Sequence, residues 1–205
     1  MSIVKLNNRG VKNATAFGSI SSLGSMVFIK KLTASSSATL SFVDGTSSVV
    51  LDNTYKEYLF TFNNMHPATN DALLTMNMSI DSGSNYNVTK TTTFFHAYHA
   101  EDGSEAILMY NADKDLAQST NPANISQGTS NANDQAISGY LHLFNPSGTV
   151  GVKHFIARTS HEIGGYSRDV YTAGYGNTTS AVDAIQFKFD SGNIDAGDIC
   201  LYGIA

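Results

Sequence analysis

Apolar and polar residues alternate along most of the chain, with the period of two that is typical of β-strands. Between residues 72 and 81 the even-numbered positions are apolar, and the odd-numbered positions after Leu73 are polar. Successive side chains of a strand point to opposite faces, so we predict a half-buried strand here. Similar patterns predict further strands at 26–33, 38–43, 48–51, 57–63, 94–100, 106–110, 140–144, 152–158, 185–189 and 199–202.

Turn sequences separate the predicted strands. Examples are Asp44-Gly45, Asp102-Gly103 and the segment 145–148, Asn-Pro-Ser-Gly, all of which are typical of tight turns. Many short strands at near-regular spacing, without a long helical pattern, favour a sandwich over a parallel α/β sheet. We therefore expect an all-β, antiparallel β-sandwich with a jelly-roll-like arrangement.

Two polar segments show no sustained period. Residues 111–135 are rich in Asn, Ala, Ser, Gln and Asp, so we expect a long polar loop with one short helical turn at 113–118. Loops of this length are usually functional or interfacial. The Gly-punctuated N-terminal segment predicts an extended arm over residues 1–24, which leaves residues 25–205 as a single sandwich domain.

The charge pattern argues against two classes of partner. The chain has 12 Lys and Arg against 17 Asp and Glu, and no basic run is longer than Lys30-Lys31. Nucleic-acid grooves and anionic membrane surfaces require clustered cations, so we expect neither partner. No window approaches the roughly 18 apolar residues of a membrane-spanning helix. Ser, Thr and Asn supply 61 of the 205 residues, which predicts a small-polar surface.

The N-terminus and the cysteine content indicate where the chain is made. The first eight residues lack the apolar stretch of a signal peptide, and the single Cys200 cannot form an internal disulfide. We therefore expect synthesis in a reducing cytosol. A component of a virus particle, made in the host cytoplasm and released by lysis, is compatible with this expectation.

Motifs for catalysis and for tight metal binding are weak. On a strand, His96 and His99 would point to opposite faces and could not share one ion without a bulge. The adjacent residues of Ser160-His161-Glu162 would also splay apart, whereas a catalytic triad requires convergence in space. Segments 81–87 and 111–115 place oxygen-bearing side chains at alternating positions, which leaves a loop-bound calcium ion open, although the second lacks the Gly and Glu of an EF-hand loop. We expect no enzyme activity, no cofactor and no metal.

A Gly-rich run near residue 170 concentrates tyrosines and an arginine. Tyr and Arg are enriched at protein interfaces because they combine a large rigid face with a polar tip. An ordinary strand and turn is the alternative interpretation of the same run. The candidate contact residues are Tyr166, Arg168, Tyr171 and Tyr175.

Several stretches resemble structural proteins of tailed bacteriophages, of the kind found in marine phages of cyanobacteria. They are MSIVKLNN (1–8), SLGSMVFIKKLTAS (22–35), YLFTF (58–62), GYLHLFNPS (139–147) and AVDAIQFKFDSGNIDAGDICLYGI (181–204). The resemblance spans essentially the whole chain and implies a virion protein with a jelly-roll-like fold. It supplies no catalytic motif.

Three hypotheses about function follow from the resemblance and the composition. The first is a capsid decoration or cement protein, a homotrimer that docks on the major capsid protein or other virion proteins through its loops and N-terminal arm. The second is a tail- or fibre-associated module that binds a host surface glycan through the four candidate contact residues. The third is an enzyme such as a depolymerase, which would need two carboxylates facing one groove. We expect the first.

Overall fold

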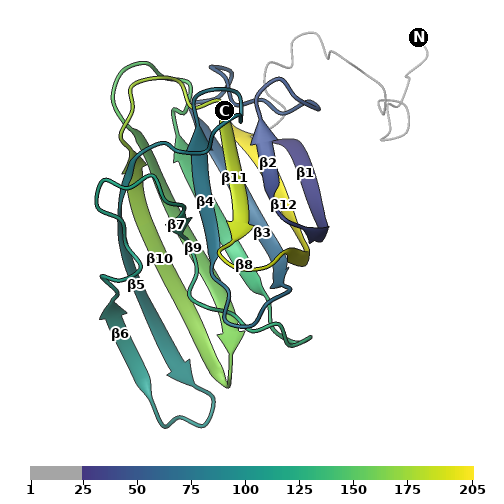
Figure 1. The fold of residues 1–205 in the computed structure, drawn as a ribbon, viewed down its shortest axis with the longest axis vertical. Coiled ribbons are helices and arrows are strands. Elements are labelled where there is room, and N and C mark those ends of the chain that lie inside the picture. The colour runs from purple at the N-terminus through teal and green to yellow at the C-terminus, as the bar shows by residue number, and fades with distance from the viewer. Residues whose placement is uncertain (1–24) are drawn as a thin grey trace, which may run out of the picture.

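The computed structural model describes residues 25–205, which form two antiparallel sheets packed face to face (Figure 1). The prediction of an all-β, antiparallel β-sandwich is confirmed, whereas the finer jelly-roll arrangement stays a prediction. The arm expected at residues 1–24 lies outside the described residues. Residues 25–205 contain no helix, and so none that could cross a membrane.

The large sheet has eight strands in the order β1-β12-β3-β8-β9-β10-β5-β6, and the small sheet has four in the order β2-β11-β4-β7. The strands of the large sheet are β1 (Met26–Ser37), β3 (Glu57–Pro67), β5 (Lys90–Ala100), β6 (Ala106–Tyr110), β8 (Ile137–Phe144), β9 (Lys153–Ile163), β10 (Tyr166–Gly176) and β12 (Ile194–Ile204). Those of the small sheet are β2 (Leu40–Val43), β4 (Leu74–Ser79), β7 (Ala123–Asn124) and β11 (Ala184–Phe189).

Aromatic side chains fill the space between the two sheets. Phe60 and Phe62 alternate with more exposed residues along β3, so both point inward onto Phe187 of β11. Their ring centroids lie 5.3 and 5.2 Å from that of Phe187. All three side chains are buried, and Phe42 of β2 joins the same cluster. Burying rings of this size contributes much of the favourable free energy of such a core.

Strand β4 is buried on both faces, so the expectation of a half-buried strand there is wrong. Asn77 lies on the face that alternation assigns to solvent, but its amide nitrogen donates to the carbonyl oxygens of Tyr86 (2.6 Å) and Thr120 (3.0 Å). Lys90 Nζ donates to Asn77 Oδ1 and to the carbonyl oxygen of Val88, both at 2.6 Å. Flanking loops therefore cover this face.

The long polar segment 111–135 packs on the sandwich. It contributes β7, which extends the small sheet beside β4, and Ile125, Ser126 and Thr129 are buried. It contains turns but no helix, so the helical turn expected at 113–118 is wrong. The strand expected at 48–51 is also absent, because Leu51 N–H bonds the side chain of Asp44 (2.7 Å) in a turn instead of pairing with a strand.

The large sheet is wider than the small one. Strands β5, β6 and β10 extend beyond the region that the small sheet covers, at the lower left of Figure 1. The face of the large sheet directed away from the small sheet is called the outer face below. Large side chains on the outer face are exposed, among them Phe95, Tyr140 and Ile156.

Candidate functional site

A row of aromatic and cationic side chains crosses the outer face. Its members occupy directly paired positions on five neighbouring strands, so they point to the same side of the sheet. We call them the aromatic row: Tyr140 (β8), Arg158 (β9), Tyr171 (β10), Phe95 (β5) and Tyr110 (β6).

The centre of the aromatic row is held by stacking and by an ion pair. The rings of Phe95 and Tyr171 are parallel within 2°, with centroids 5.0 Å apart. From β9, the strand on the other side of β10, the Arg158 guanidinium carbon lies 4.8 Å from the centroid of the Tyr171 ring. Arg158 donates through Nε (2.9 Å) and Nη2 (2.7 Å) to the two carboxylate oxygens of Asp169. These bonds, and then the charge of Asp169, raise the pKa of Arg158, so the side chain stays cationic and fixed in direction.

Several members of the aromatic row are exposed to solvent. Tyr140 and Phe95 are each 38% exposed, and Tyr110 on the edge strand is 54% exposed. The hydroxyl of Tyr110 donates to the carboxylate of Asp115, and this bond raises the pKa of Tyr110. Rings that are half-exposed and held in place lose little conformational entropy on binding, which suits them to a contact surface.

An apolar depression of about 440 Å³ lies on one side of the aromatic row. Its lining residues come from β5, β8, β9 and β10, and its floor includes Gly174. A Cβ at Gly174 would lie 2.6 Å from the carbonyl oxygen of Thr91, so no larger residue fits without a shift. The lining residues with the largest side chains are Phe144, His154, Phe155, Ile156 and Tyr175.

A polar groove of about 420 Å³ lies on the other side of the row. Along β9 the outward residues run from Ile156 through Arg158 to Ser160, so the surface changes from apolar to polar along one strand. The groove has small hydroxyl side chains beside one aromatic ring and one ion pair. Its lining residues are Ser138, Gly139, Tyr140, Arg158, Ser160, Ser167 and Asp169.

The four contact residues predicted from the sequence do not share one face. Tyr171 belongs to the aromatic row, and Tyr175 lines the apolar depression beside His154 (centroids 6.1 Å apart). Tyr166 and Arg168 occupy the alternate positions of β10, with the buried Val170, and both pack around Tyr98 of β5. The chain therefore divides the Tyr/Arg run between two sides of the large sheet.

Sequence reasoning missed most of the aromatic row. Alternation within each strand already assigns Phe95 and Arg158 to the face opposite the core, since Phe94 and Phe155 are buried. Their alignment with Tyr171 depends on which strands are neighbours and in which register. That information comes from contacts between distant segments, and no pattern within one segment contains it.

A buried polar cluster lies on the inner side of the same strands. His96 and His161 are 3% and 4% exposed, and Gln127 Nε2 lies 3.3 Å from His96 Nδ1. Neither ring nitrogen of His161 makes a hydrogen bond of good geometry among the described residues, although the backbone of Gly128 raises its pKa by less than the other groups lower it. Burial, and then the positive charge of Arg168, lower the pKa of His161 to about 4. His161 is therefore neutral at physiological pH.

The histidine motifs lie as the strand geometry predicts. His96 is buried and His99 is exposed, so the two point to opposite sides of β5. Ser160 is exposed on the outer face whereas His161 is buried, which confirms that this adjacent pair does not converge. Among residues 25–205, no group of three or more His, Cys, Asp or Glu side chains could hold a metal ion.

No protein-family model, curated protein or solved structure matches the chain. The outer face combines ordered rings, one fixed cation, an apolar depression and a polar groove, an arrangement suited to binding another molecule.

Proposed function

We propose that the protein is a non-enzymatic structural component of a bacteriophage particle, a decoration or cement protein that docks on the outer capsid lattice. The aromatic row is the single observation on which the proposed docking surface rests. Ordered Tyr, Phe and Arg side chains, flanked by an apolar depression, are the residue types that dominate the energetics of protein interfaces. The particle itself is proposed from the resemblance to phage virion proteins.

The docking surface proposed is the outer face, in place of the long loop expected from the sequence. The buried residues of segment 111–135 hold that loop against the sandwich, so it cannot extend toward a partner without exposing Ile125 and Ser126. The outer face needs no rearrangement to dock. Many modest contacts, repeated over a lattice of capsid subunits, then give strong attachment by avidity.

The experiment compares variants for their presence on purified particles. Phe95→Ala combined with Tyr171→Ala removes the centre of the aromatic row, and we expect the amount bound per particle to fall at least about tenfold, because hot-spot truncations at interfaces often cost 2 kcal/mol or more. Val150→Ala is the matched control, since Val150 is an apolar side chain, 87% exposed, in the β8–β9 loop. Full occupancy of the double variant would overturn the proposed docking surface.

A second candidate function, recognition of a host surface glycan, is favoured by the polar groove. Tyr140 offers a ring for stacking on a sugar, and Ser160, Ser167 and the Arg158–Asp169 pair offer hydrogen-bonding groups. Tyr140→Ala should then abolish binding of purified protein to host cells, whereas Tyr175→Ala, outside the groove, should not. Unchanged cell binding by the Tyr140 variant would remove this candidate.

A further inference from the structure

The edge strand β6 is apolar and is exposed on both of its faces. All five residues of Ala106–Tyr110 are exposed, with Leu108 at 73%. Within the part of the chain that the structure describes, β6 pairs with β5 and has no strand on its other side. It lies where the large sheet projects beyond the small one (Figure 1). Free backbone groups beside apolar side chains form a template for a further strand.

The other sheet edges carry features that discourage pairing. Strand β1, at the opposite edge of the large sheet, has Lys30 and Lys31 and a break in register between Phe28 and Lys30. The edges of the small sheet are only four residues (β2) and two residues (β7) long. Charges, bulges and short length are the usual protections of an edge. Strand β6 has no charge, no proline and no register break.

We propose that β6 pairs antiparallel with β6 of a second copy of the chain, about a two-fold axis at Leu108. Leu108 then faces its own copy, Ile107 faces Met109, and the small Ala106 faces the large Tyr110. Directly opposite side chains in antiparallel strands contact each other, so the strand complements itself in size. An interface of this isologous kind closes as a dimer, and it joins two large sheets into one.

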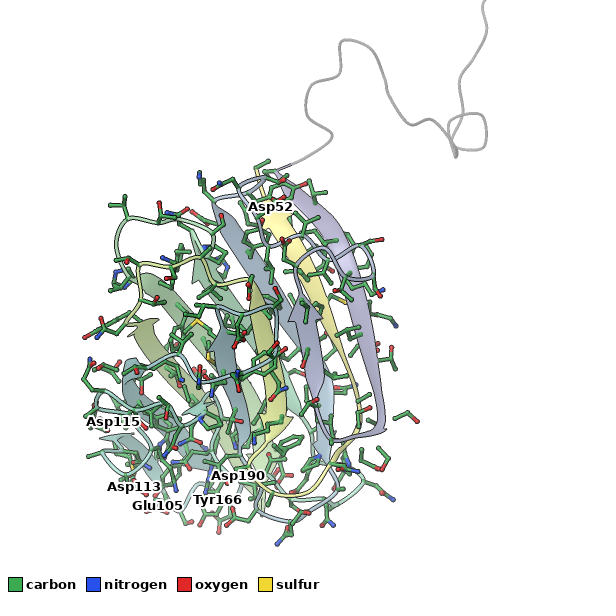
Figure 2. The ribbon with its side chains drawn as sticks, turned by 45° about the horizontal axis from the view of Figure 1, so that its top comes forward. Asp52, Glu105, Asp113, Asp115, Tyr166 and Asp190 are labelled. Atoms are coloured by element: carbon green, nitrogen blue, oxygen red, sulfur yellow. The ribbon has the colours of Figure 1, made fainter. Side chains whose placement is uncertain are left out.

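Electrostatics favours this orientation. A parallel pair in register would place Glu105 beside Glu105, whereas the antiparallel pair places it beside Asn111. Carboxylates flank both ends of β6, and Figure 2 shows Glu105, Asp113 and Asp115 at the same end of the molecule. Because these groups approach across the dimer, added salt should strengthen association by screening them.

The trimer expected from the sequence would need a different contact. In a ring closed by strand pairing at the two edges of the large sheet, β6 of one copy would pair with β1 of the next, because a head-to-tail interface uses two different surfaces. That contact would desolvate Lys30 or Lys31 against an uncharged strand, which costs free energy. The two-fold β6 pair avoids this cost.

The first test measures molar mass against concentration by sedimentation equilibrium on the full chain. We expect a monomer–dimer equilibrium that shifts toward dimer at higher salt. Leu108→Lys places two lysines face to face at the two-fold axis, and like charges directly opposite are destabilising, so the dimer should be lost. Ile156→Lys is the control, since Ile156 is 48% exposed on the outer face of β9, away from the edge. A wild-type monomer at all concentrations, a trimer, or a dimer unaffected by Leu108→Lys would overturn the proposal.

A second test distinguishes the register. Ala106→Lys with Tyr110→Glu puts opposite charges across the antiparallel pair and should retain the dimer, whereas Ala106→Lys with Tyr110→Lys should abolish it. Equal behaviour of the two double variants would contradict the register about Leu108. Hydrogen exchange adds an independent readout, since amides of 106–110 should be protected only at concentrations that favour the dimer. Protection of these amides in the monomer would mean that another segment of the same chain covers β6, and this result would overturn the proposal.

Discussion

Phe95 and Tyr171 lie directly opposite each other on β5 and β10, with parallel rings whose centroids are 5.0 Å apart. Arg158 covers the Tyr171 ring from the next strand. This contact orders the centre of the outer face before any partner binds. The rings are therefore preorganised for the docking that we propose. The contribution of the Phe95–Tyr171 contact to stability can be measured separately from its contribution to binding.

A double-mutant cycle on this pair should show a modest coupling. Phe95→Ala and Tyr171→Ala each remove one ring of the stack, and we expect an interaction free energy of about 0.5–1 kcal/mol in urea unfolding, as for other cross-strand aromatic pairs. Phe95→Ala with Tyr175→Ala is the control cycle, because Tyr175 lines the depression beside His154. Equal coupling in the two cycles would contradict a specific Phe95–Tyr171 contact.

Acid should destabilise the fold through His161. Its pKa is about 4 in the folded protein against 6.5 for an ordinary histidine, so the unfolded chain binds more protons between these values. Stability should fall as the pH drops from 6.5 toward 4, by up to about 3 kcal/mol, and this contribution should be constant above pH 6.5. His96 and Arg168 face the same site, and their charges add to the penalty for a protonated His161.

The measurement is urea unfolding at several pH values for wild type and His161→Leu. The free energy of the wild type relative to the variant should decline across this window. His99→Leu, which removes an exposed histidine from the same sheet, is the control and should leave the pH dependence unchanged. A constant wild-type minus His161→Leu difference between pH 6.5 and 4 would refute this account of His161.

Lys90 should make the stability of the fold depend on pH in the alkaline range. Burial lowers its pKa to about 8 from 10.5, and its ammonium donates to two neutral oxygens, Asn77 Oδ1 and the carbonyl of Val88. Because the unfolded chain binds more protons between pH 8 and 10.5, stability should rise as the pH increases through this range, by up to about 3 kcal/mol. Lys90→Met should remove that rise, whereas Lys31→Met, at an exposed lysine, should retain it. If the unfolding free energies of wild type and Lys90→Met changed with pH in parallel, this account of Lys90 would be contradicted.

Alternation predicted the strands best where one face packs on the core. Along β9, and within 57–62 of β3 and 185–189 of β11, the buried residues are those that the period of two assigns inward. The pattern misled at β4, where loops from 80–90 and from 111–135 cover the outward face, because burial there depends on segments distant in sequence. Strand β10 was not among the strands that alternation predicted, and its run was interpreted either as a contact surface or as an ordinary strand and turn. Its Gly174 and Gly176 allow close packing against Thr91 and Met78.

The candidate site was predictable only in residue type. A Tyr- and Arg-rich run identified β10 and its Tyr171, but the same run placed Arg168 beside it in sequence and on the other side of the sheet in space. The arginine that does contact Tyr171 is Arg158, from a different strand. Strand order and register determine which arginine lies beside Tyr171, and both are properties of the whole fold.

The most direct test of a capsid decoration role is the copy number of the protein in purified particles. Quantitative mass spectrometry, normalised to the major capsid protein, gives this ratio. The proposal predicts a ratio near one or a simple fraction of it, as expected for a protein that repeats over the lattice. A few copies per particle, or none, would contradict it.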